Sequence, residues 1–115
     1  MIYIVEDDGL MAKCIAHACR PKKTKIFHNA IEAMQGIDQK VPDLIFLDIL
    51  LTGPDGFTLL NELASYNDTS EIPIVIISSI DFSGKDLSIY GVVGTINKDT
   101  MTPKEVKTYA QRFTH

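Results

Sequence analysis

The chain has 115 residues, 45% of them hydrophobic, which fits one compact domain over residues 1–115 that buries roughly two thirds of its unfolded surface. Its formal net charge is −4, and its basic cluster at residues 20–25 is typical of a solvated loop, so we expect no direct contact with nucleic acid. The apolar runs are too short to span a membrane and no signal peptide precedes the first of them, so we expect a cytoplasmic protein that does not enter a membrane.

The chain begins with an apolar run at residues 2–5, typical of a strand that is buried on both faces. Three acidic residues follow this strand, Glu6, Asp7 and Asp8, and we interpret Asp8 as the N-cap of the next helix. Apolar spacing predicts that the inner face of this helix comprises Leu10, Cys14, Ile15 and Ala18, and that Arg20 and Pro21 close it.

Cys14 and Cys19 lie five positions apart in this region, which suits neither a disulfide nor the usual metal-ligand spacings. We therefore expect two buried or half-buried thiols.

A short second strand is predicted at residues 25–27. Asn29, followed three residues later by Glu32, has the pattern of an N-cap with its reciprocal acid, and it opens a second helix. This helix should end before Pro42 and direct three apolar side chains inward: Ile31, Met34 and Ile37.

The third strand, residues 44–48, is continuously apolar until it ends on Asp48. The breaker residues at 52–56 must form a loop, after which a third helix is marked by Phe57, Leu60, Leu63 and Ala64. A fourth apolar strand at residues 74–77 leads to Ser78.

The segment at residues 81–90 has weak periodicity and predicts a short or irregular fourth helix. Residues 92–97 form the fifth strand, which leads to Lys98. Thr102 and Glu105 have the spacing of a capping box, with Pro103 at the first helical position. The last helix should bury Val106, Tyr109, Ala110 and Phe113.

Strict alternation of strand and helix predicts an α/β fold: a doubly wound, five-stranded parallel sheet with helices on both faces. Ligands of such sheets bind at the carboxyl ends of the strands, where this sequence places Glu6, Asp7, Asp48, Ser78 and Lys98.

Carboxylates about 4 Å apart repel one another by something like 4 kcal/mol at a partly buried site, so this group requires a cation. Oxygen ligands that leave room for water suit magnesium, Mg²⁺. A lysine and a hydroxyl beside it supply the positive charge and the hydrogen-bond donor that a phosphoryl group needs.

These residues in this order resemble the receiver domain of bacterial two-component response regulators, a CheY-like, flavodoxin-like fold. The resemblance covers the whole chain and rests on residues 5–8, Asp48 with Asp55 and Gly56 downstream, residues 73–78, and Lys98.

The resemblance implies that Asp48 accepts a phosphoryl group from a phosphohistidine of a sensor histidine kinase or phosphotransfer protein. It implies that Asp7, Asp48 and the main-chain carbonyl of Leu50 ligate Mg²⁺ while Glu6 holds a metal-bound water. Ser78 and Lys98 would contact the phosphoryl group, and a downstream effector protein or an output domain would read the change.

Three departures from the family pattern concern signalling. Thr95 takes the place of the usual switch aromatic, with Tyr90 as a possible substitute that we interpret as a core residue. Asp99 replaces the proline that commonly follows the lysine, and we expect a trans peptide bond there. The segment from Ser78 to Lys98 is slightly short.

Two other functions compete with a signalling switch that turns over no external substrate. A pseudo-receiver would act as a protein-binding module without phosphorylation, and the altered Thr95 position fits it. A Mg²⁺-dependent phosphatase of the haloacid dehalogenase type is disfavoured, because Leu50 stands where that class has a second aspartate.

Overall fold

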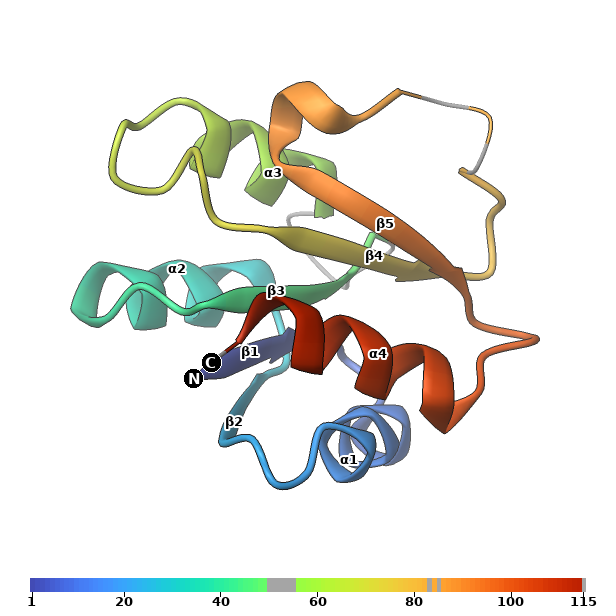
Figure 1. Cartoon of the computed structure of the whole chain (residues 1–115). Coiled ribbons are helices and arrows are strands. Elements are labelled where there is room, and N and C mark those ends of the chain that lie inside the picture. Colours follow the sequence, from blue (N-terminus) through green and yellow to red (C-terminus); the bar gives the residue numbers. More distant parts are fainter. Residues whose placement is uncertain (50–55, 83, 85, 115) are drawn as a thin grey trace.

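The computed structural model describes residues 1–49, 56–82, 84 and 86–114. It contains a five-stranded parallel sheet with the strand order β2-β1-β3-β4-β5 (Figure 1). Its strands are β1 (Ile2–Val5), β2 (Thr24–Phe27), β3 (Leu44–Asp48), β4 (Ile74–Ser78) and β5 (Val92–Asn97). The three central strands are buried along their whole length, because helices cover both faces of the sheet.

The described helices are α1 (Gly9–Ala18), α2 (Ala30–Gln39), α3 (Gly56–Ala64) and α4 (Pro103–Phe113), with a 3₁₀ turn η1 (Ser88–Tyr90). Two apolar clusters divide these elements between the faces of the sheet. α2, α3 and η1 pack on one face, and α1 and α4 on the other (Figure 1). The predicted doubly wound α/β fold is confirmed.

Three predicted helix starts have the expected caps. The Asp8 carboxylate accepts hydrogen bonds from the main-chain N–H groups of the first turn of α1, and the side chain of Asn29 accepts one from Glu32 N–H. Thr102 and Glu105 form the reciprocal capping box of α4. Glu32 departs from the predicted reciprocal pattern of α2. Its Oε1 accepts a hydrogen bond from the main-chain N–H of His28, one residue before the N-cap Asn29.

The predicted inner face of α1 is partly wrong. Leu10 is 75% exposed and Cys14 is exposed, whereas Ala12 is fully buried beside Ile15. A small alanine lets the helix approach the sheet closely, so the larger side chains turn toward solvent. Only Cys19, in the C-cap, is the buried thiol that we expected.

α2 shows the same effect. Ile31 is 56% exposed, while Ala33 and Gly36 are buried against the sheet. A Cβ at position 36 would overlap the ring of Phe27, so glycine is required there for close contact. Ile37 is buried as predicted and Met34 is partly buried.

The second half of the chain follows the predicted order. In α3, Leu60 and Leu63 are buried as expected, but Phe57 is 40% exposed. Within the described part of residues 81–90, regular helical structure is limited to η1. The Lys98–Asp99 bond is trans, as expected.

The register of the strands places their carboxyl ends side by side. Val5 pairs with Leu47, Asp48 with Ile77, and Ser78 with Asn97. The residues that follow β1, β3, β4 and β5 therefore meet at one edge of the sheet. None of the helices in the described part of the chain has the length and apolar character that a membrane crossing requires.

Candidate metal and phosphoryl site

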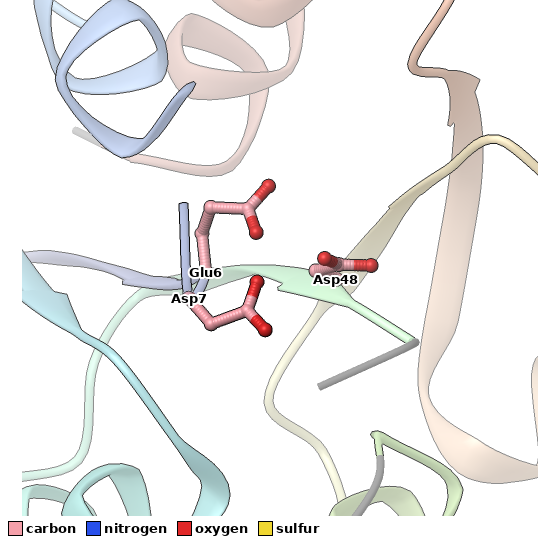
Figure 2. A group of neighbouring side chains, drawn as sticks. All are labelled: Glu6, Asp7 and Asp48. Carbon is pink, nitrogen blue, oxygen red and sulfur yellow. The ribbon is translucent and has the colours of Figure 1, made fainter. Parts of the chain in front are cut away.

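Three carboxylates gather at the carboxyl edge of the sheet. Glu6 and Asp7 follow β1, and Asp48 ends the neighbouring strand β3 (Figure 2). Their oxygen atoms lie within 4.8 Å of one another. Glu6 and Asp48 are only 1% and 5% exposed, whereas Asp7 is exposed to solvent. The sequence prediction that these carboxylates converge agrees with this geometry.

Lys98 supplies a positive charge between two of these carboxylates. Its Nζ lies 2.7 Å from Glu6 Oε1 and 2.9 Å from Asp48 Oδ2. The position of Lys98 is fixed by the end of β5 and by its main-chain N–H, which donates to the carbonyl of Ser78 at 2.9 Å. The pairing spans the sheet from β1 to β5 and ties the strand ends together.

Glu6 is held in an environment that disfavours its charge. Burial is the largest cause and raises the pKa of Glu6 to about 7; the Lys98 ammonium opposes it, the neighbouring Asp48 adds to it, and the Asp8 N–H lowers the pKa slightly. The Asp8 N–H donates to Glu6 Oε2 at 3.3 Å. Glu6 Oε1 contacts Lys98 as an ion pair but has no donor aligned for a hydrogen bond, so it is a buried acceptor with capacity left.

Lys98 remains a cation at this site. Desolvation by burial lowers its pKa, but the neighbouring Glu6 and Asp48 carboxylates outweigh that effect, so the net pKa is raised. The lysine therefore keeps its charge where an incoming anion would meet Asp48.

Ser78 ends β4, beside the strand that carries Asp48, and it is 1% exposed. Its Oγ accepts a hydrogen bond from the N–H of Ile80 at 3.1 Å. A hydroxyl that accepts through its oxygen keeps its own proton for a further acceptor. Ser78 is thus a candidate donor toward a ligand at the strand ends.

The donor set fits Mg²⁺. Among the described residues it consists of carboxylate oxygens, one of which is the buried Glu6 Oε1 without a hydrogen-bond donor, and exposed Asp7 leaves room for water. Leu50, whose main-chain carbonyl is the remaining predicted ligand, lies outside the described residues, as do the loop residues 52–55. Asp8 faces the helix and not this group, since its carboxylate caps α1.

An aromatic side chain close to this edge was missed by the sequence analysis. Phe82, four residues after Ser78, is 7% exposed and packs edge-on against Phe57 of α3, with ring centroids 5.8 Å apart. It shares a cavity of about 20 Å³ with Ser78 and Thr95. The sequence signal that could have identified Phe82 is an aromatic residue within a largely polar segment. Tyr90 is half-buried in η1 and packs against the core, as we interpreted it.

Comparison with known proteins places this geometry in context. Residues 2–110 match the family model described as the response regulator receiver domain. Over 104 residues the chain is 29% identical to protein-glutamate methylesterase/protein-glutamine glutaminase 3 of Rhodospirillum rubrum, an alignment that covers 84% of this chain and 27% of that protein. The chain spans between 15% and 32% of the length of the first four curated relatives.

Solved structures with the same fold include receiver domains. The receiver domain of NtrX from Brucella abortus superposes with a TM-score of 0.83 at 27% identity, covering 97% of this chain and 96% of that one. The phosphorylated cyanobacterial phytochrome response regulator RcpA has a TM-score of 0.81 at 26% identity, covering 97% of this chain and 91% of that one.

Proposed function

Since the chain belongs to the response regulator receiver domain family of two-component signalling, we propose that it is a phosphoacceptor switch whose acceptor is Asp48. The phosphoryl donor is a phosphohistidine of a sensor histidine kinase or phosphotransfer protein. The observation that carries this proposal is the placing of Lys98 Nζ between Glu6 and Asp48, beside a group of three carboxylates.

Asp48 is the nucleophile of this proposed reaction. A carboxylate oxygen attacks phosphorus, the new O–P bond forms as the P–N bond of the donor breaks, and the histidine nitrogen leaves with the electron pair. Lys98 pairs with the incoming phosphoryl oxygens, and the Ser78 hydroxyl donates to one of them. Because Ser78 ends β4 and Lys98 directly follows β5 in a packed sheet, they meet the phosphoryl group with little reorganisation.

Asp7, Asp48 and the carbonyl of Leu50 would hold Mg²⁺, with Glu6 binding a water of the ion. When bound, Mg²⁺ neutralises charge that develops on the phosphoryl oxygens. The close grouping of the Glu6, Asp7 and Asp48 carboxylates and the Glu6 Oε1 atom without a hydrogen-bond donor support this assignment.

Phosphorylation adds roughly two negative charges at Asp48 and gives Ser78 a new acceptor. We expect the segment after β4 to move toward the site and the surface formed by η1, β5 and α4 to change. A downstream effector protein or an output domain would read that surface. A cytoplasmic location and a single receiver domain over residues 1–115 belong to the same proposal, and family membership supports them.

A second candidate, the pseudo-receiver, is favoured by one observation. Thr95 stands on β5 where the family has its switch aromatic, and its side chain shares a small cavity with Ser78 rather than filling it. Such a module would bind its partner without phosphorylation. The Mg²⁺-dependent phosphatase is a weaker alternative, because a receiver switches once per phosphorylation and turns over no external substrate.

The test is incubation with Mg²⁺ and acetyl phosphate, followed by intact mass measurement. We expect one phosphate adduct on the parent and none on Asp48→Asn. Asp68→Asn is the matched control and should accept phosphate normally, because this exposed carboxylate lies between α3 and β4, at the opposite edge of the sheet from the carboxyl ends of the strands. No adduct on the parent would favour the pseudo-receiver, and steady hydrolysis of acetyl phosphate faster than adduct decay allows would favour the phosphatase.

The metal assignment has its own measurement. Asp7→Asn should weaken Mg²⁺ binding in isothermal titration calorimetry, since it removes an exposed carboxylate of the group. Unchanged Mg²⁺ affinity in this variant would show that the ligand assignment is wrong.

A further inference from the structure

A groove of about 440 Å³ lies at the opposite edge of the sheet from the phosphoryl site. It is formed where α2 and α3 end, together with the segments that lead from them into β3 and β4. In Figure 1 these helix ends lie on the same side as the two chain termini, away from the carboxyl ends of the strands. Its volume is in the range of pockets that bind ligands or anchor side chains.

The groove offers apolar surface that the fold leaves uncovered. Ile37 is buried at its base, but Val41 is 46% exposed and Tyr66 is 55% exposed along its sides. Large apolar side chains exposed together in a concave site gain stability when a partner covers them.

The same groove is acidic. Asp38, Glu62 and Asp68 line it, and Lys40 is the single cation among the described lining residues. All three carboxylates are exposed, and no ion pair to any of them is found in the part of the chain that the structure describes. With three carboxylates and one lysine, the described lining of the groove carries a net negative charge.

Two of these acids occupy positions that are unfavourable for their own helices. Asp38 lies in the last turn of α2 and Glu62 in the last turn of α3, where the partial negative charge of the helix terminus repels a carboxylate. Neither last turn contains a basic residue. Helix stability thus does not explain the acids, whereas a cationic occupant would.

The arrangement of the acids indicates an extended cation and not a single metal ion. Among the described residues, the acidic group whose atoms are close enough to share an ion is Glu6, Asp7 and Asp48. The groove acids belong to separate elements and are spread along the apolar surface. We propose that the groove binds a short basic segment of a partner protein, in which an apolar side chain lies between lysine or arginine residues.

A seven-residue capped peptide of alternating lysine and leucine is the probe, with binding followed by ¹⁵N–¹H NMR titration of the full chain. We expect chemical-shift changes concentrated in residues 34–41 and 62–69. The double variant Glu62→Gln with Asp68→Asn should weaken binding about three- to tenfold, because exposed ion pairs contribute modestly. Lys40→Gln should have the opposite effect and tighten binding about twofold, since it removes the opposing charge.

The matched control is Glu71→Gln with Asp99→Asn, which removes the same charge from exposed positions outside the groove lining. It should change the affinity by less than about twofold. Equal weakening by both double variants would show that general charge attracts the peptide and would overturn the proposal. Shifts centred elsewhere, or binding of spermine as tight as that of the peptide, would overturn it as well.

Discussion

Replacement of Lys98 by methionine tests the electrostatics of the site without any phosphoryl donor. Methionine keeps most of the side-chain length but removes the charge that lies 2.7 Å from Glu6 and 2.9 Å from Asp48. The two carboxylates are then left nearly buried with no described cation between them. We expect the Mg²⁺-free protein to be less stable.

The magnitude follows from the burial of the partners. Removing one member of a buried ion pair typically costs about 3–5 kcal/mol. The Lys98 side chain is 19% exposed, so solvent screens part of the interaction, and we expect the free energy of unfolding to fall by about 2–3 kcal/mol. A second substitution, Glu6→Gln, should recover about half of that loss, because it removes the carboxylate that is left unpaired.

Urea unfolding followed by circular dichroism, in buffer with a chelator, measures both effects. Lys107→Met on the exposed face of α4 is the control and should change stability by less than about 0.5 kcal/mol. If Lys98→Met loses no more stability than this control, or if Glu6→Gln adds to the loss, the counter-ion role of Lys98 is refuted.

Three further predictions concern the rest of the fold. Iodoacetamide at pH 8.5 should alkylate Cys14 and spare Cys19 until urea is added, because Cys19 is 1% exposed and burial raises its pKa to about 12. Intact mass measurement and peptide mapping would identify the alkylated cysteine. Since folding raises this pKa from 9.0, the stability associated with the neutral thiol should be lost as pH rises from about 9 toward 12. Thr102→Ala should lower the free energy of unfolding by about 1 kcal/mol, since it breaks the capping box with Glu105, whereas Thr100→Ala outside the helix should be nearly neutral in the same urea titration.

The sequence was sufficient to predict the strands and the meeting of Glu6, Asp48 and Lys98 because both depend on local information. A continuously apolar run that ends on a polar residue marks a buried strand and the residue that follows it. Parallel pairing then brings such residues together, whatever the details of packing. The site geometry therefore needed no knowledge of side-chain contacts.

The inner faces of the helices were harder to predict because close packing depends on small side chains. Ala12 and Gly36 contact the sheet more closely than Leu10 or Ile31, yet an apolar pattern gives greater weight to the larger residues. Phe82 was missed for a related reason. Its burial depends on contact with Phe57 from a distant helix, which no local pattern reports.

The lifetime of the phosphorylated state is the last property for which the chain makes a prediction. Hydrolysis of the acyl phosphate needs a water aligned opposite Asp48, and Ile80, two residues after Ser78, is placed by sequence to face that water. The N–H of Ile80 is bonded to Ser78 Oγ, which ties this position to the site, and its apolar side chain, 47% exposed, can neither donate nor accept a hydrogen bond. We therefore expect slow self-dephosphorylation. The sequence predicts the same influence for Leu50, which lies outside the described residues.

Ile80→Glu should speed the loss of phosphate about tenfold, equivalent to ~1.4 kcal/mol of transition-state stabilisation, because a carboxylate can orient the water. Decay is followed by intact mass with Mg²⁺ present and no partner protein. Ile89→Glu is the matched control, since this η1 residue is 77% exposed and lies before β5, so the same charge is added away from the carboxyl ends of the strands. Faster decay in both variants would point to added negative charge in general, and unchanged decay in Ile80→Glu would show that this position does not control the water. If decay is faster in Ile80→Glu but not in Ile89→Glu, the added charge in general does not explain the effect, and the side chain at position 80 must contact the water.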